Sequence, residues 1–249
     1  MPDLNLVSFN THCGLWPHTG TRRGTEYDLG GALASFGDPD VIVLQEVYRP
    51  DGRSSPVDDF AAARGYEAHD LLLGRVSFRP DRPRLDPTGP GTVSVTVLSR
   101  LPARELGRPA VGPTPGDPLG QRRVLHLEVA VAGAPIDLVA VHLTSRLPHG
   151  PPLQLRRLAR ALPAPGRPAV VVGDCNFWGP PTVTLLRGWR RAVRGRTWPA
   201  HRPHSQIDHV LVRGGIAARG SRVLPEVGSD HRPVRTHLVL PDRDRPAPP

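Results

Sequence analysis

The sequence predicts an α/β protein in which two β-sheets pack face to face and helices cover their outer faces. Eight short runs rich in Val, Ile and Leu recur along the 249 residues, separated by turns rich in Gly and Pro. Only three segments carry a helical pattern, and many strands with few helices favour packed sheets. No internal repeat or shift in composition marks a boundary, so we expect one domain over residues 1–241.

The predicted strands are short, and several are too continuously apolar to have a face in water. In chain order they are 4–9, 41–44, 93–98, 124–131, 136–143, 169–172, 207–212 and 234–240. The predicted helices are 27–36, 57–64 and 153–162, the last behind two prolines that suit a first helical turn. The proline-rich stretch 79–91 predicts a surface loop, and residues 242–249 predict a disordered tail.

The charge of the chain favours an anionic partner such as a phosphate ester or a nucleic acid. The formal net charge is +9, and all 32 basic residues are arginine. A coding bias that replaces lysine and enriches Pro (31) and Gly (26) explains this composition equally well. The charge is therefore compatible with a phosphate-binding function but does not establish one.

Several classes of protein are excluded or disfavoured by the same composition. Two cysteines cannot form a disulfide framework, and no Cys-x-x-Cys pair suggests a zinc knuckle. Every apolar run is too short to cross a membrane. The segment 1–5 lacks the features of a signal peptide. We expect a cytoplasmic monomer without membrane association.

Polar residues of the types found in enzyme sites stand at the ends of six apolar runs. They are Asn10, Glu46, His142, Asp174 with Asn176, Asp208, and Asp230 with His231. A scaffold of strands can point such side chains into one cleft. A strand end is also an ordinary place for a polar residue, so a single one indicates little. Six together predict a shared site.

These residues occur in segments that resemble, in order, the motifs of the endonuclease/exonuclease/phosphatase superfamily. The segments are Ser8-Phe9-Asn10-Thr11-His12, Leu44-Gln45-Glu46, Val141-His142-Leu143-Thr144, Gly173-Asp174-Cys175-Asn176, Ile207-Asp208-His209 and Ser229-Asp230-His231. The resemblance implies a four-layer α/β sandwich with two central mixed β-sheets, as in deoxyribonuclease I. It also implies hydrolysis of phosphoesters with a divalent metal ion.

The expected metal ligands are Asn10, Glu46 and Asp230. Two carboxylates and an amide carbonyl form a set of oxygen donors, which suits Mg²⁺, with Mn²⁺ as an alternative. A bound Mg²⁺ can polarise a phosphoryl oxygen. The absence of a Cys/His cluster argues against zinc.

The remaining candidates supply the proton chemistry. Asp174 is expected to orient or deprotonate the attacking water, and the Asn176 amide to donate to a non-bridging phosphate oxygen. The resemblance implies that Asp208 holds the imidazole of His231, which is the other candidate for the base. It also implies that His142 bonds the phosphate or protonates the leaving oxygen. The sequence does not decide between base and acid.

The sequence indicates the residues that bind the substrate less specifically. Arg123 is a weak candidate for a phosphate contact, and Ser94 or Thr96 could replace an amide contact that many relatives have. The basic stretch 188–198 could bind a nucleic-acid backbone and stack a base. Alternatively, it is a solvated surface anchored by its two tryptophans.

Two classes of function follow. The first is a metal-dependent phosphoesterase, most directly of the nuclease type, with a small phosphate-containing metabolite as the alternative substrate. The second is a catalytically inactive module that binds phosphate or nucleic acid in the same cleft. Three carboxylates near a polyanion favour the enzyme, because without a metal they would repel phosphate.

Overall fold

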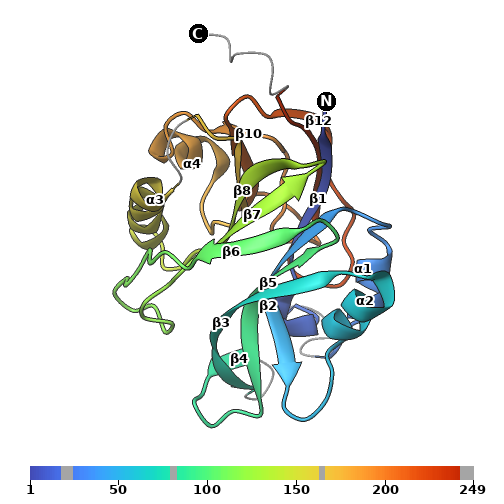
Figure 1. Cartoon of the computed structure of the whole chain (residues 1–249). Helices are drawn as coiled ribbons and strands as arrows, with labels where there is room; N and C mark the ends of the chain where they lie inside the picture. The colour runs from blue at the N-terminus through green and yellow to red at the C-terminus, as the bar shows by residue number, and fades with distance from the viewer. Residues whose placement is uncertain (18–24, 79–82, 163–165, 242–249) are drawn as a thin grey trace.

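Two mixed β-sheets form the centre of the molecule (Figure 1). The computed structural model describes residues 1–17, 25–78, 83–162 and 166–241. The first sheet has seven strands in the order β12-β13-β1-β2-β5-β3-β4, and the second has six in the order β10-β11-β9-β8-β7-β6. In each sheet one pair is parallel, β1 with β2 and β8 with β9, and the other pairs are antiparallel. The predicted mixed sheets are confirmed.

The strands and helices have the following bounds. The strands are β1 (Asp3–Asn10), β2 (Val41–Pro50), β3 (Glu67–Phe78), β4 (Pro83–Leu85), β5 (Gly91–Ser99), β6 (Ala103–Gly107), β7 (Leu125–Val131), β8 (Ala134–His142), β9 (Ala169–Asp174), β10 (Arg190–Arg191), β11 (Asp208–Arg213), β12 (Ala217–Val223) and β13 (Val234–Val239). The helices are η1 (His12–Gly14), α1 (Leu29–Ala34), α2 (Pro56–Arg64), α3 (Gly150–Ala161) and α4 (Gly179–Leu185).

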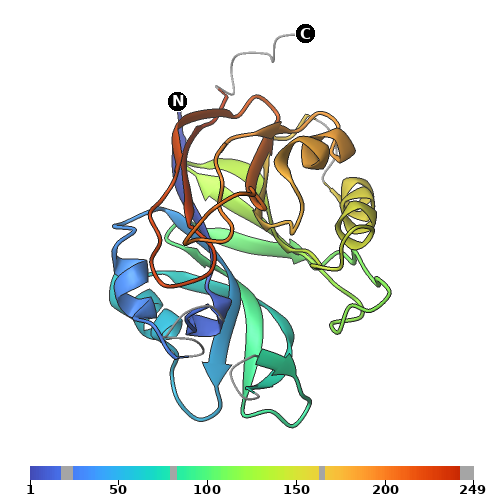
Figure 2. The ribbon, with the colours of Figure 1, turned by 180° about the vertical axis from the view of Figure 1, so that it is seen from behind.

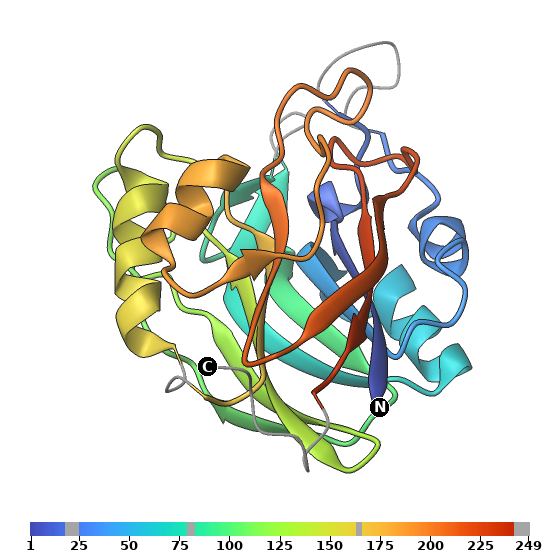
Figure 3. The ribbon, with the colours of Figure 1, turned by 90° about the horizontal axis from the view of Figure 1, so that it is seen from above.

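Four layers are visible from above, with α3 and α4 on one side, α1 and α2 on the other, and the sheets between them (Figure 3). The largest apolar cluster, which includes Leu6, Val43, Leu138 and Val172, lies between the sheets. A second cluster packs the helix α1 residue Leu33 against the first sheet, and a third packs helix α3 against the second sheet. Burial on both faces explains the continuous Val, Ile and Leu runs of the central strands.

All eight predicted strands and all three predicted helices are present, with shifts of a few residues at their ends in most cases. Helix α3 begins at Gly150 and carries Pro151 and Pro152 in its first turn, as predicted. The loop predicted over 79–91 is wrong in part, because Pro83–Leu85 pairs with β3 as strand β4 and β5 begins at Gly91. Its first residues, 79–82, lie outside the described residues. The predicted tail, 242–249, lies outside the described residues, and the single domain stays a prediction.

The sequence did not predict the four edge strands β4, β6, β10 and β12, nor β3 and α4. An edge strand has water on at least one side, so it does not need a continuous apolar run. Strand β12 illustrates this, because its first four residues are exposed. Helix α4 has Gly-Pro-Pro at its start and no apolar repeat of helical period.

The two ends of the chain meet in the first sheet, where β13 pairs with β1 (Figure 2). This pairing brings the segment before β13, which contains Asp230 and His231, to the strand end that contains Asn10. Among the described residues, no helix is long and apolar enough to span a membrane.

Candidate active site

Three predicted site residues stand side by side across the second sheet. His142 on β8 pairs with Asp174 on β9, and Asp174 pairs with Asp208 on β11. Residues directly opposite one another in neighbouring strands point to the same face of a sheet. The strands can approach closely here because Gly173 precedes Asp174; a Cβ on Gly173, at φ +135°, would lie 2.1 Å from the Val141 carbonyl oxygen.

Glu46 reaches the site through an irregularity in strand β2. The pairing of β2 with β5 shifts register between Leu44 and Val47, and Glu46 has a left-handed φ of +56°. A bulge of this kind redirects a side chain, and backbone strain of this kind is often found at functional sites. The Thr11 hydroxyl donates to the Glu46 carbonyl oxygen at 2.8 Å and holds the bulge in place. The carboxylate, a quarter exposed, faces His142.

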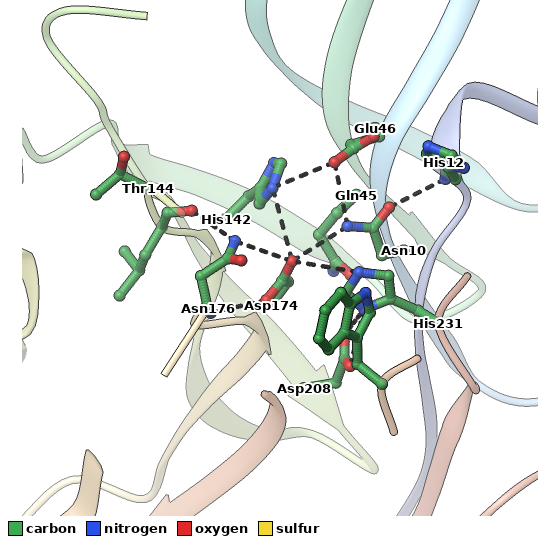
Figure 4. A network of polar contacts seen from close by, with 12 residues as sticks. Asn10, His12, Gln45, Glu46, His142, Thr144, Asp174, Asn176, Asp208 and His231 are labelled. Carbon is green, nitrogen blue, oxygen red and sulfur yellow. Dashed lines mark hydrogen bonds and ion pairs between the residues drawn. The ribbon is translucent and has the colours of Figure 1, made fainter. Parts of the chain in front are cut away.

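Asp174 is the centre of the polar network (Figure 4). Its Oδ1 accepts from the Asn176 backbone N–H at 2.7 Å, and its Oδ2 accepts from the Asn10 amide at 3.2 Å. Burial raises the pKa of the Asp174 carboxyl to about 7, against the opposing effect of His231. Such a carboxyl can take up and release a proton near neutral pH.

His231 and Asp208 form a buried pair. Nδ1 of His231 lies 3.0 Å from Asp208 Oδ2, and Nε2 lies 3.9 Å from both Asp174 Oδ2 and Asp230 Oδ1. Burial lowers the pKa of His231, but Asp208 and the other carboxylates outweigh it and raise this pKa well above its usual value. The imidazole is therefore cationic at neutral pH and directs its second nitrogen into the site.

His142 has the opposite electrostatics. Its Nε2 lies 3.6 Å from Glu46 Oε1 and 3.7 Å from Asp174 Oδ2, and its buried Nδ1 has no hydrogen-bond partner among the described residues. Burial, together with Arg122 and His231, lowers the pKa of His142 well below its usual value. His142 is therefore neutral at neutral pH.

Glu46 and Asp230 could hold a divalent cation. Both carboxylates are about a quarter exposed, and both line the same cavity. Oxygen donors of this kind suit Mg²⁺. Asp174, Asp208 and His231 also offer ligand atoms within 4.8 Å of one another. We favour Glu46 and Asp230, because the carboxylate of Asp208 is already paired with His231.

The structure corrects the expected orientation of two amides. The Asn10 nitrogen, not its oxygen, faces Glu46 and Asp174, because two carboxylates attract a donor; the oxygen accepts from the His12 backbone N–H. The Asn176 amide donates to the Leu143 carbonyl and to Asp174. Both of its hydrogens are thus used within the protein, so it is not free to donate to a phosphate as predicted.

Arg122, rather than the predicted Arg123, faces the site. Arg123 is exposed and donates to the Arg108 carbonyl, away from the cavity. Arg122 is buried, forms a two-point ion pair with Asp117, and donates to the His142 carbonyl at 3.0 Å. Neighbouring residues of an extended chain point in opposite directions, which explains the difference.

Other predicted contacts lie outside the site. Ser94 and Thr96 are buried and bond to Arg49 and Asp70, so they cannot replace a substrate contact. In the basic stretch, Trp189 is buried under the guanidinium of Arg213, which confirms its structural role. Cys13 and Cys175 are buried.

A cavity of about 590 Å³, which we call the β9–β11 cavity, contains the site. Its wall includes residues to which the sequence analysis gave no role in the site. Trp198 donates from its indole nitrogen to Asp230 at 3.3 Å, and Trp178 is 47% exposed at the cavity edge. In the sequence, the one indication of a role for Trp178 is that it follows Asn176 by two residues. Ser229 was also missed, and its hydroxyl links Asn10 to His231. The lining residues are His12, Glu46, Arg122, His142, Ser145, Leu147, Asp174, Asn176, Trp178, Trp198, His204, Ser205, Ile207, Asp230 and His231.

Comparison with known proteins gives one family. The model of the endonuclease/exonuclease/phosphatase family matches residues 7–231, a span that includes every polar residue of the network described above. No curated protein matches the chain.

Several solved structures share the fold. An endonuclease/exonuclease/phosphatase from Beutenbergia cavernae is 22% identical with a TM-score of 0.69, covering 96% of this chain and 72% of its own. A mannosyl-6-phosphatase from Bacteroides thetaiotaomicron is 14% identical with a TM-score of 0.67, covering 95% of this chain and 100% of its own. A humanized D. rerio TDP2 is 16% identical with a TM-score of 0.64, covering 95% and 99%. At these identities the likeness concerns the fold.

Proposed function

Because the chain belongs to the endonuclease/exonuclease/phosphatase family, we propose that it hydrolyses phosphoesters by attack of water on phosphorus with a bound divalent cation. The proposal rests on one observation: His142, Asp174 and His231 meet two partly exposed carboxylates, Glu46 and Asp230, in the wall of one cavity. In the reaction a bond forms between water oxygen and phosphorus, the bond to the leaving oxygen breaks, and the proton of water ends on the leaving alcohol.

Each side chain has a proposed task. Glu46 and Asp230 would hold Mg²⁺, or Mn²⁺ in its place, together with Asn10 if its amide turns its oxygen to the cation. The cation would polarise a phosphoryl oxygen and offset the charge of the transition state. Asp174, with its pKa near neutrality, accepts the proton of the attacking water. The cationic His231, held by Asp208, bonds a phosphate oxygen, and the neutral His142 is placed to bond the leaving oxygen.

The burial of Trp189 excludes this residue as a stacking surface for a nucleic-acid base. Stacking on single-stranded nucleic acid needs exposed aromatic faces, and Trp189 is covered by Arg213. Of the described tryptophans, Trp178 is the exposed one, and it lies at the edge of the β9–β11 cavity, where a small substituent of the phosphate would contact it.

Hydrolysis of bis(para-nitrophenyl) phosphate or para-nitrophenyl phosphate is expected with Mg²⁺ and is expected to stop with EDTA. Replacing Glu46 by Gln should raise the Mg²⁺ concentration needed for half-maximal rate at least about tenfold, because one of two charged ligands is lost. Titration of the rate with Mg²⁺ measures this. The control is Glu67→Gln, which changes an exposed residue of β3. An unchanged titration in Glu46→Gln would contradict its role as a ligand. A protein that binds these esters without cleaving them would be the inactive binding module.

Replacing Trp178 by alanine is expected to raise KM for aryl phosphoesters about tenfold with little change in kcat. The indole is 47% exposed and lines the cavity, and stacking on an aromatic face is worth about 1–3 kcal/mol. Steady-state kinetics separate the two constants. Trp178→Phe, which keeps an aromatic face, should retain most of the affinity, and equal KM values in all three proteins would rule out this contact.

A further inference from the structure

A second cavity, of about 600 Å³, adjoins the site, and most of its lining residues have no part in the chemistry proposed above. We call it the β3–β5 cavity. It shares Glu46, Arg122, His142 and Ser145 with the β9–β11 cavity. The two cavities therefore meet at the residues proposed to hold the cation and to bond the leaving oxygen.

Strand order places the cavities on opposite sides of these shared residues. In the first sheet, β2 with Glu46 lies between β1 and β5; in the second, β8 with His142 lies between β9 and β7. The β9–β11 cavity extends over the side of β9 and β11, and the β3–β5 cavity extends over β5, β3 and β4. A phosphate bound beside Glu46 and His142 thus has a cavity available for a substituent on each of two sides.

Seven of the thirteen residues that line the β3–β5 cavity are apolar. Val76 and Val93 are buried in its floor and belong, with Cys13, to a small apolar cluster separate from the three larger ones. Leu73, Leu85 and Leu119 are partly exposed around them. A hydrocarbon group gains free energy from contact with these apolar side chains.

Charge at the cavity edge suits an anionic ester. Arg84 and Arg146 line the cavity together with Arg122, whose charge is offset by Asp117, and Glu46 is the one acidic residue among the described lining residues. Positive charge around a concave site raises the local concentration of an anion. A phosphodiester keeps one negative charge and has two substituents, which matches one shared anion site with a cavity on each side.

We infer that the substrate is a phosphodiester and that the β3–β5 cavity binds its hydrocarbon substituent, while the other substituent lies in the β9–β11 cavity. This inference rests on the proposed function and specifies its substrate. Hydrolysis transfers water across one P–O bond and gives a phosphomonoester and an alcohol. The second substituent serves for binding and for positioning the phosphate.

The test is a series of para-nitrophenyl alkyl phosphates with methyl, butyl and octyl groups, assayed with Mg²⁺. Each methylene that leaves water for an apolar wall contributes up to about fourfold in kcat/KM. We expect the butyl ester to exceed the methyl ester at least about tenfold. Equal rates along the series, or hydrolysis of para-nitrophenyl phosphate alone, would overturn the inference and leave the proposed function standing. No hydrolysis of any ester would contradict the proposed function itself.

Variants of two residues that line the β3–β5 cavity test whether the preference for longer alkyl groups arises in this cavity. Leu73→Gln and Leu119→Gln should flatten the series while leaving the rate with the methyl ester within about threefold of wild type, because the amide is polar but adds no charge beside the anionic ester. The matched control is Leu72→Gln, since Leu72 precedes Leu73 on β3, is 58% exposed and does not line the cavity. If Leu73→Gln does not fold, Leu119→Gln, in a loop, still tests the inference.

Two further results decide against the inference. One is a series that stays steep in both cavity variants, which would place the alkyl chain elsewhere. The other is nicking of supercoiled plasmid with a kcat/KM above that of the octyl ester, which would identify DNA as the substrate.

Discussion

Replacing His231 by alanine is expected to lower kcat/KM for phosphoester hydrolysis about a thousandfold and to leave the protein folded. The imidazole is fixed by Asp208 through Nδ1 and directs Nε2 toward Asp174 and Asp230. Its raised pKa makes it a fixed cation where negative charge develops on phosphate oxygens. Steady-state kinetics, with a circular dichroism melt for the fold, measure the effect.

The matched control is His237→Ala. His237 lies six residues further on, in β13, and pairs with Asp3 at the surface. This variant should keep wild-type kinetics. Near-wild-type turnover in His231→Ala would remove His231 from the mechanism.

The cationic state of His231 also predicts how Asp208→Asn changes the pH dependence of the rate. A cationic His231 is active below its pKa, so activity is lost as pH rises through that pKa. Asp208 is the largest of the contributions that raise the pKa of His231. Without its charge, the pKa falls, and the alkaline limb of the pH–rate profile should move to lower pH. If the alkaline limb does not move, it reflects the titration of a group other than His231.

Replacing Arg122 by methionine is expected to destabilise the protein by about 3–5 kcal/mol. The side chains of Arg122 and Asp117 are 8% and 0% exposed, and Nε of Arg122 lies 2.6 Å from Asp117 Oδ2. Removing the cation leaves a buried carboxylate without its partner, and methionine cannot donate to the His142 carbonyl. Denaturant-induced unfolding measures the loss.

Two comparisons isolate the buried pair. Arg104→Met breaks an ion pair with Glu128 in which the arginine is 70% exposed, and it should cost about 0–1 kcal/mol. Adding Asp117→Asn to Arg122→Met should recover part of the lost free energy of unfolding, because burial of an amide costs less free energy than burial of a carboxylate. If Arg122→Met costs no more than Arg104→Met, the pair does not stabilise the site.

The central strands and the types of residue at their ends could be predicted from the order of amino acids. Strands such as β1 and β9 are covered by a second sheet on one face and by helices or loops on the other, so their residues must be apolar throughout. The polar residues that end these runs cannot be buried without partners, and they therefore stand out in the sequence as candidates for a site. Six of them line the cavity, and Asp208 and Asn10 bond to residues that do; the six are Glu46, His142, Asp174, Asn176, Asp230 and His231.

The way in which these groups face one another could not be predicted, because it depends on tertiary contacts. The bulge that redirects Glu46 depends on the register of β2 against β5, and the inward position of Arg122 depends on the buried partner Asp117. The orientation of the Asn10 amide depends on Glu46 and Asp174, which are distant in sequence. The β3–β5 cavity is formed partly by β3 and β4, in which no apolar run is longer than the three leucines of β3. Most of these features depend on contacts between segments far apart in the chain, and such contacts leave no periodic pattern in the sequence around either partner.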